Sequence, residues 1–373
     1  MKKLRFLSVI VLVGLLLGVV AGCDKKKKGS DPYTPLFVYF YPLNLDVNIT
    51  KLLPYFVNYP TDRDKMGLRD CPMTVTYEHY SKTWDVTTTN EYMFLSDGNL
   101  IKQSGNFVMR REVVTFKYAN DSNLVKITTE ERGHYKNTKS DDGFTYDAAG
   151  RLVRRDQNGR GHYDTYTLLY TYHENGALKS ISPERKDGST SESGITFSTM
   201  QFDSLSNMVY FETPRTTNMF LKDLNSGKKG KSVTTYSYTG HLCTKAVEKI
   251  PIKFDRGTET LTCTSTFTYN SQGDLASWTY SGGVYKERGN NWRVDDMTFT
   301  IGFDYVYDER GNWTQAKITF PANIDEIPAL RLFYKASKDG IATNRDDTPS
   351  VNAGEIPVLT VERTIEYRED EKK

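Results

Sequence analysis

The chain has 373 residues, and its 49 Lys and Arg side chains nearly balance its 47 Asp and Glu side chains, which leaves a formal net charge of +2. A nucleic-acid-binding domain carries a basic face or stripe, so this balance excludes that class and no nucleic acid is expected as a partner. The 25 Tyr and 18 Phe residues favour β-sheet, and the length suffices for one large or two ordinary domains.

Residues 1–22 have the pattern of a secretory signal peptide. Three basic residues lie among the first five, residues 6–20 are mostly apolar, and small residues precede Cys23. The apolar stretch is shorter than the roughly 20 residues that a membrane-spanning helix needs. A plain cleaved signal peptide is the alternative to the lipoprotein interpretation that follows.

The run VAGC at residues 20–23 resembles the lipobox of bacterial lipoproteins. The resemblance implies a mature chain that begins at a lipidated Cys23, acylated with diacylglyceryl and palmitate groups, and that has a lipid bilayer as its partner. It also implies a location in the cell envelope of a Gram-negative bacterium. Asp24 resembles an inner-membrane retention signal of enterobacterial lipoproteins, but other lineages do not follow that rule, and the outer membrane is favoured.

The next segments carry the chain towards its first strands. Residues 25–28 are all lysine and are followed by Gly, Ser, Asp and Pro, a composition that buries too little apolar surface to fold. We therefore expect residues 23–34 to be the lipidated Cys with a flexible tether. Residues 35–89 are expected to form an N-terminal β region, in which residues 73–77 belong to an early strand.

A repeated pattern occupies residues 90–320. In most units two large residues, usually aromatic, stand two positions apart, Gly or Ser follows four positions later, and a large apolar residue comes two positions after that. The second large residues lie 24 to 38 residues apart, a period typical of repeat architectures; they are Phe94, Tyr118, Tyr146, Tyr172, Phe202, Tyr238, Tyr269 and Tyr307.

Each unit predicts a β-hairpin. Asp or Asn at the first position of a type I turn can bond its own backbone, and Gly at the fourth position accepts a left-handed conformation. The turn-forming residues expected on this basis are Gly98, Gly150, Gly176, Gly273 and Gly311. The predicted fold class is all-β, an antiparallel sheet built of about eight hairpin repeats, extended or curled.

Residues 146–152, with the sequence YDAAGRL, resemble the YD repeats of the RHS family at every specified position of the pattern Tyr-Asp-x-x-Gly-Arg-Leu. Residues 307–313 match its first half. In that family, many such repeats form a long β-sheet that spirals into a shell around a toxin or decorates a cell surface. The resemblance implies extended antiparallel sheet over roughly residues 90–320, whereas the few, unequal copies here argue against a shell.

Residues 321–373 are expected to form a long excursion followed by a final strand at 358–367. A connection over residues 321–357 is far longer than usual, and loops of that length tend to be functional or disordered. It carries four large apolar residues, which we interpret as a possible partner-binding site: Leu330, Leu332, Phe333 and Tyr334. The alternative is that they cover an open end of the sheet core.

Three cysteines follow Cys23. The turn signal at residues 255–258 centres a hairpin near position 256.5, which places Cys263 opposite Ile250 and Cys243 opposite Asn270. These cysteines would lie too far apart for the roughly 5.5 to 6 Å Cα separation of a disulfide. We therefore expect buried free thiols.

No catalytic constellation appears in the sequence. No two of the five histidines have metal-ligand spacing, so neither a metal site nor a cofactor is expected. Adjacent acids on a strand point to opposite faces, which argues against the paired carboxylates of a glycosidase. Trp side chains, which could stack on sugars, are expected to fill a face of the sheet instead.

The sequence as a whole indicates a membrane-anchored extracytoplasmic β-repeat protein, not an enzyme, that acts as a binding or scaffold module. Its partner would be an envelope protein or a glycan. The alternative is a carbohydrate-binding surface lipoprotein, and a glycoside hydrolase is a distant third.

Overall fold

The computed structural model describes residues 68–368 except for short gaps. The gaps are residue 71 and residues 82–85, 108–109, 120–122, 134–136, 158–165, 185–198, 206, 214–219, 222–230, 241, 255–256, 289–290, 332–333, 335–350 and 352–355. The expected signal peptide, the lipidation site Cys23 and the tether lie outside the described residues.

The described chain is predominantly β-strand, as the fold-class prediction requires. The strands are β1 Pro72–Ser81, β2 Val86–Phe94, β3 Leu100–Phe107, β4 Arg110–Ala119, β5 Asn123–Gly133, β6 Asn137–Tyr146, β7 Leu152–Gln157, β8 Tyr166–Tyr172, β9 Leu178–Pro183, β10 Thr199–Phe202, β11 Met208–Thr213, β12 Ser232–Thr239, β13 Leu242–Phe254, β14 Gly257–Tyr269, β15 Leu275–Arg288, β16 Asn291–Tyr307, β17 Trp313–Thr319, β18 Val358–Glu362 and β19 Thr364–Tyr367. A 3-10 helix at Ile324–Glu326 and a helical turn at residues 328–331 interrupt the pattern.

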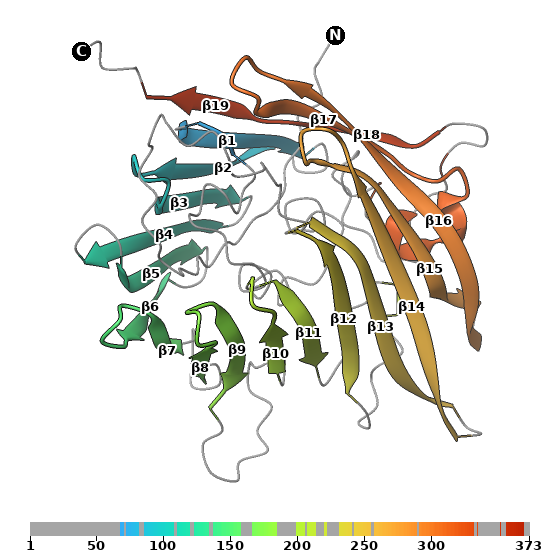
Figure 1. The fold of residues 1–373 in the computed structure, drawn as a ribbon. Helices are drawn as coiled ribbons and strands as arrows, with labels where there is room; N and C mark the ends of the chain where they lie inside the picture. The colour runs from blue at the N-terminus through green and yellow to red at the C-terminus, as the bar shows by residue number, and fades with distance from the viewer. Residues whose placement is uncertain are drawn as a thin grey trace.

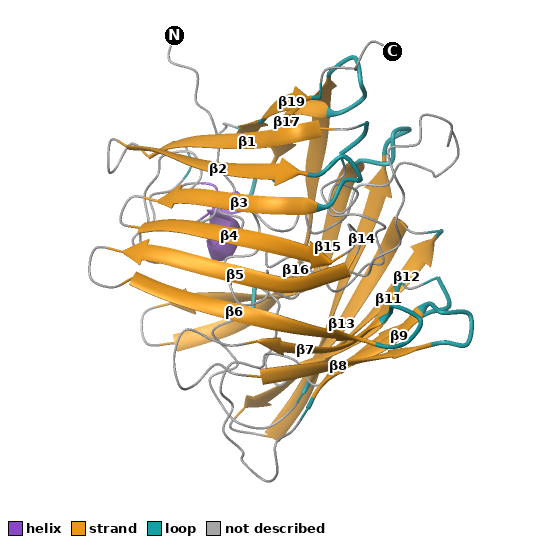
Figure 2. Ribbon diagram, turned by 90° about the vertical axis from the view of Figure 1, so that its left-hand side faces the viewer, coloured by secondary structure: helices purple, strands orange, loops and turns teal. Residues whose placement is uncertain are grey.

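All 19 strands belong to one antiparallel sheet in which each strand from β1 to β17 pairs with the next along the chain, and β19 pairs with β1. Figure 1 shows them following one another around an arc, from β1 and β2 at the top through β7 to β10 at the bottom to β16 on the right. Figure 2 shows the wall from β1 to β8 side by side. The sheet is therefore curled, and its first and last strands approach each other.

The C-terminal segment joins these two ends. β18 pairs with β17, β19 pairs with β1, and Arg363 alone separates β18 from β19. The backbone N–H of Arg363 donates to Thr314 O at 3.0 Å. The single final strand expected at residues 358–367 is thus two strands, because the chain changes partner where the curled sheet meets itself. We name this junction the seam: it comprises β17, β18, Arg363, β19 and β1, together with the turns next to them.

The repeat turns explain the sequence pattern. Gly150 N donates to Asp147 O at 3.0 Å, and Asp147 N donates to Arg151 O at 2.9 Å. The Asp147 side chain accepts from the backbone N–H groups of Ala149 and Arg151 at 3.0 and 2.9 Å. The register shifts by a β-bulge beside Tyr146, so the turn combines a type I geometry with a bulge.

Glycine is needed at the bulge position because the backbone there is left-handed. The expected turn residues all have positive φ: Gly98 (93°), Gly150 (76°), Gly176 (84°), Gly273 (82°) and Gly311 (79°), and the shortened unit adds Gly240 (60°). The hairpins therefore begin and end where the repeat predicts.

Replacing Gly176 with Val should lower the free energy of unfolding by about 1 to 2 kcal/mol, the strain of a left-handed non-glycine residue. An added Cβ would meet nothing within 4 Å, so steric clash is absent. Gly143→Val is the matched control, since that glycine has open space and no positive φ. Equal melting temperatures for the two variants in a thermal denaturation would refute the turn assignment.

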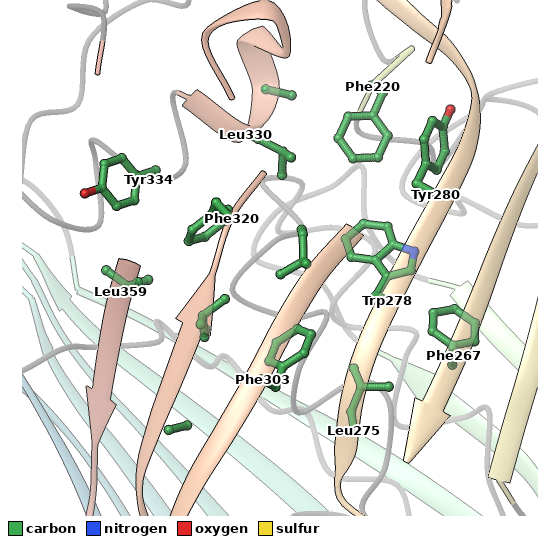
Figure 3. Close-up of a cluster of buried hydrophobic side chains, with 14 of the residues drawn as sticks. Phe220, Phe267, Leu275, Trp278, Tyr280, Phe303, Phe320, Leu330, Tyr334 and Leu359 are labelled. Carbon is green, nitrogen blue, oxygen red and sulfur yellow. The ribbon is translucent and has the colours of Figure 1, made fainter. Parts of the chain in front are cut away.

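The inner face of the curled sheet holds the core. One cluster contains Val75 of β1, Tyr92 of β2 and Ile301 of β16, so opposite walls share it, and a second cluster lies between β7 and β11. Phe220, from a loop, packs against Tyr280 with ring centroids 4.5 Å apart (Figure 3). Aromatic alternation thus places the large residues inside the curl.

The long excursion contributes to this core. Leu330 is 0% exposed and Tyr334 is 1% exposed, and Tyr334 packs against Phe320 at 5.5 Å between ring centroids (Figure 3). The expectation that these two residues bind a partner is wrong, because burial leaves them no free surface; they cover the core, as the alternative predicted. Leu332 and Phe333 lie outside the described residues.

The hairpin between β13 and β14 also differs from the prediction. Phe254 pairs with Gly257, Ile250 pairs with Leu261 and Cys263 pairs with Glu248. The turn is one residue earlier than expected, which shifts each pairing by two positions. Cys243 and Cys263 are nevertheless free and buried, as expected.

Candidate functional site

Tyrosine hydroxyls fasten most of the repeats to an earlier one. Tyr146 donates to Leu124 O at 2.6 Å, which is the carbonyl of the residue that restarts the strand in the preceding repeat. The same contact recurs from Tyr118 to Leu100, Tyr172 to Leu152, Tyr238 to Met208, Tyr269 to Cys243 and Tyr305 to Leu275. Burial raises the pKa of Tyr146, so the hydroxyl stays protonated and donates. These tyrosines therefore serve the fold.

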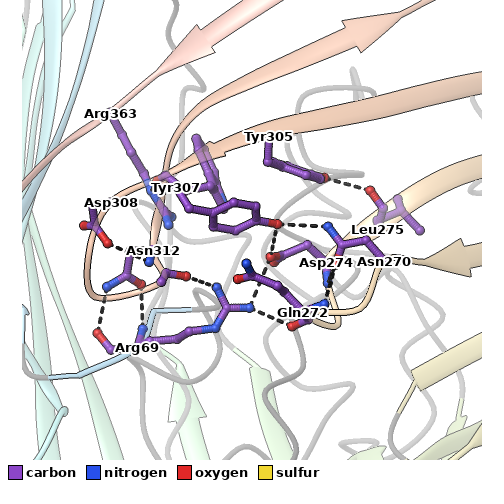
Figure 4. Close-up of polar contacts among 12 residues, drawn as sticks. Arg69, Asn270, Gln272, Asp274, Leu275, Tyr305, Tyr307, Asp308, Asn312 and Arg363 are labelled. Atoms are coloured by element: carbon purple, nitrogen blue, oxygen red, sulfur yellow. Dashed lines mark hydrogen bonds and ion pairs between the residues drawn. The ribbon is translucent and has the colours of Figure 1, made fainter.

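A polar cluster occupies the seam (Figure 4). Arg69 Nη2 lies 3.1 Å from Asp274 Oδ2 and donates to Gln272 O at 2.7 Å, while Nη1 donates to Gly311 O. The Arg69 backbone exchanges hydrogen bonds with the side chain of Asn312, at 2.6 and 2.8 Å. The first described residues are thereby latched onto two repeat turns more than 200 positions away in the sequence.

We call the Arg69 contacts with these two turns the latch. The neighbouring polar side chains bind one another. Tyr307 donates to Asp274 Oδ2 at 2.6 Å and accepts from Asn270 at 2.9 Å (Figure 4). Tyr367 donates to Asp308 Oδ2 at 2.5 Å, and burial together with this bond raises the pKa of Tyr367 to about 12. Both tyrosine hydroxyls therefore stay protonated and donate to carboxylates of the same cluster. We conclude that the cluster has a structural role.

The other candidate chemical groups are likewise engaged or inert. Asp142 pairs with Arg155, and Asp141 pairs with Lys126, which lowers the pKa of Asp141. Burial raises the pKa of the Cys243 thiol to about 12, so it is not a nucleophile at neutral pH. The described residues contain no group of three or more His, Cys, Asp or Glu that could hold a metal ion.

The outer face of β14, β15 and β16 carries a regular array of hydroxyl groups. Its cross-strand rows are Thr264–Ser281–Thr298, Thr266–Thr279–Thr300 and Thr268–Ser277–Gly302. We call the eight Thr and Ser residues of these rows the hydroxyl grid; Gly302 ends the third row without a hydroxyl. Strands lie about 4.8 Å apart and rise about 3.4 Å per residue, so the hydroxyls repeat roughly every 4.8 Å across the sheet and 6.8 Å along it.

The grid is exposed and uncharged. Thr266, Thr298 and Thr300 are among its exposed members, others are partly exposed, and the intervening residues Trp278 and Phe299 are buried in the core. Hydroxyls bond across strands, with Thr279 Oγ1 and Thr300 Oγ1 2.8 Å apart. A hydroxyl has one donor and two acceptor sites, so each retains capacity for a partner.

The opposite wall has a different surface. On β5 and β6, Lys126 lies 2.8 Å from Asp141 and Lys139 lies 2.9 Å from Glu130, with all four side chains substantially exposed. Charged pairs thus cover this part of β5 and β6, whereas the grid itself contains no charged side chain and is bordered by Lys245 of β13 and Asp304 of β16.

Sequence reasoning missed the grid. The alternation T-C-T-S-T-F-T at residues 262–268 could have revealed it, since alternate residues of a strand share one face. The Trp side chains were expected to fill a face of the sheet, and Trp278 and Trp313, the two whose burial the structure describes, are buried. Within the described segments, no helix has the length and apolar character to cross a bilayer.

No protein-family model and no curated protein sequence matches the chain. A porin-like protein from Bacteroides uniformis is similar at 14% identity with a TM-score of 0.28, over 61% of this chain and 95% of that one. A Photorhabdus luminescens Tc holotoxin pore is similar at 13% identity with a TM-score of 0.30, over 66% of this chain and 14% of that one. A porin-like protein from Bacteroides vulgatus is similar at 9% identity with a TM-score of 0.24, over 67% of this chain and 93% of that one. Nothing about this chain follows from TM-scores this low.

Proposed function

We propose that this chain is a lipid-anchored, non-enzymatic binding module of the bacterial cell envelope, and that its hydroxyl grid docks an uncharged, extended partner. The grid is the observation that carries the proposal. It offers hydrogen-bond donors and acceptors at regular spacing on the face of three of the longest strands. The Asp and Asn side chains of the repeat turns, in contrast, bond the backbone of their own turns.

A neutral glycan is the second candidate for the partner. Sugar hydroxyls and grid hydroxyls are both donors and acceptors, so they complement each other without charge. Exposed aromatic side chains would add stacking, but the two described Trp side chains are buried. The first candidate, an envelope protein with an extended, uncharged backbone, would bond the same grid hydroxyls through its N–H and C=O groups.

The central row of the grid tests the proposal. Thr266→Val, Thr279→Val and Thr300→Val together remove three hydroxyls and keep β-branched side chains suited to strands. Each lost hydrogen bond is worth about 0.5 to 1.5 kcal/mol, so binding should weaken at least roughly tenfold. Glycan arrays and pull-downs from envelope extracts provide the two readouts.

The matched control is a triple Thr→Val variant on the other wall, at the exposed residues Thr115, Thr145 and Thr171. It should bind as the wild type does. Equal binding by wild type and both triple variants would exclude the grid as the docking face.

Lipid attachment is tested separately. Cys23→Ala should release the protein from membranes or leave an unprocessed precursor, because stable anchoring takes at least two acyl chains. Membrane fractionation with immunoblotting provides the measurement. A mature-sized Cys23→Ala protein that stays on membranes would contradict lipid anchoring.

A further inference from the structure

Two arginine side chains of the described sheet are almost completely buried, and they differ in their partners. Arg155 is 0% exposed and donates through Nη2 to Asp142 Oδ2 at 2.5 Å. Arg363 is 4% exposed, and its Nε donates to Trp313 O at 2.6 Å. In the part of the chain that the structure describes, Nη1 and Nη2 of Arg363 have no acceptor.

A second unpaired donor lies beside this guanidinium. Arg363 Cζ is 3.7 Å from the centroid of the Trp313 ring, and the buried Trp313 Nε1 also has no acceptor among the described residues. The guanidinium carries five N–H donors, of which the Trp313 carbonyl takes one. The seam therefore holds a positive charge and unused donors, but no described acceptor for them.

Asp308 does not fill this role. Its carboxylate accepts from the backbone N–H groups of Arg310 and Asn312 and from the Tyr367 hydroxyl, and Figure 4 draws no interaction between Asp308 and Arg363. A buried charge without a partner is strongly unfavourable. The geometry calls for an acceptor that carries negative charge.

We propose that Arg363 and Trp313 form a binding site for an oxyanion, a carboxylate or phosphate group, at the seam of the sheet. The planar guanidinium presents paired N–H groups that match two oxygens of such a group. The indole Nε1 supplies a further donor in the same region, and the ring stabilises the guanidinium by a cation–π contact.

The seam also provides the entry. β18 has five residues and β19 has four, and the chain exchanges one sheet partner for another at Arg363. Short terminal strands open locally at low free energy. A small anion therefore reaches the guanidinium when this junction opens, whereas Arg155 lies between strands that are paired on both sides.

Thermal denaturation of the purified protein with added inorganic phosphate or acetate tests the site. Each anion is compared with chloride at equal ionic strength, and the two separate phosphate from carboxylate recognition. An anion at ten times its Kd should raise the melting temperature by roughly 3 °C. Arg363→Met should abolish the shift, and in chloride it should melt no lower than wild type because an unpaired buried charge is removed.

Two variants make the result decisive. Trp313→Phe keeps the ring but removes the Nε1 donor, so the anion concentration at half-maximal shift should rise several-fold. Lys245→Met removes an exposed cation and should leave the response unchanged. The absence of a shift with both anions in wild type, or an equal shift in Arg363→Met, would overturn the proposal. If Arg363→Met does not fold, the wild-type titrations and Trp313→Phe decide.

Discussion

Replacing Arg155 with methionine should lower the free energy of unfolding by about 3 to 5 kcal/mol, the usual effect of removing one partner from a buried ion pair. Arg155 is fully buried and bonds Asp142 through Nη2 and Nε at 2.5 and 3.2 Å. Its loss leaves the buried Asp142 carboxylate without its charged partner. Urea or guanidinium denaturation followed by far-UV circular dichroism measures the change.

Lys139→Met is the control for this variant. Lys139 makes an ion pair with Glu130 at 2.9 Å, but both side chains are largely exposed, and exposed pairs contribute between about 0 and 1 kcal/mol. A similar loss of stability in the two variants would mean that the Arg155 pair is not buried as described.

Asp274→Ala should be the second most damaging change, with a loss of about 3 kcal/mol, because two hydrogen bonds that involve a charged group are each worth about 1.5 to 3 kcal/mol. Asp274 is fully buried and accepts from Arg69 and Tyr307. Without it, the segment before β1 keeps only the Arg69 hydrogen bond to Gln272 O at the turn between β14 and β15. Limited proteolysis near residue 69, together with the melting temperature, reports both effects.

Asp304→Ala is the matched control, since Asp304 is an exposed acid on β16. It should melt close to wild type and resist cleavage equally. Wild-type behaviour of Asp274→Ala in both measurements would show that the latch does not hold the two ends of the sheet together.

The repeat turns could be predicted from the sequence because their interactions join residues only a few positions apart in the chain. The Asp147 side chain bonds residues two and four positions ahead, and Gly150 occupies a left-handed conformation that few other residues tolerate. Within each hairpin the aromatic spacing also fixes which residues face the core. The centre of the hairpin between β13 and β14 lies one residue before the predicted position, since Phe254 pairs with Gly257.

The sites of the molecule could not be read in this way. The hydroxyl grid needs three strands in a specific register, and a one-residue slip would turn its hydroxyls into the core. A binding surface and a cap over the core both use large apolar side chains such as Leu330 and Tyr334. Composition alone therefore did not distinguish the two roles.

The sequence by itself determined the hairpins, their order and the inward face of each strand, since these depend on residues within a few positions of one another. Only the tertiary structure decided that the sheet curls until β19 reaches β1, that Arg69 latches onto Asp274, and that the chain changes partner at Arg363. The physical reason is that the twist of successive strands accumulates across the sheet. Small differences at each strand therefore decide whether the ends meet, and no local pattern encodes their sum.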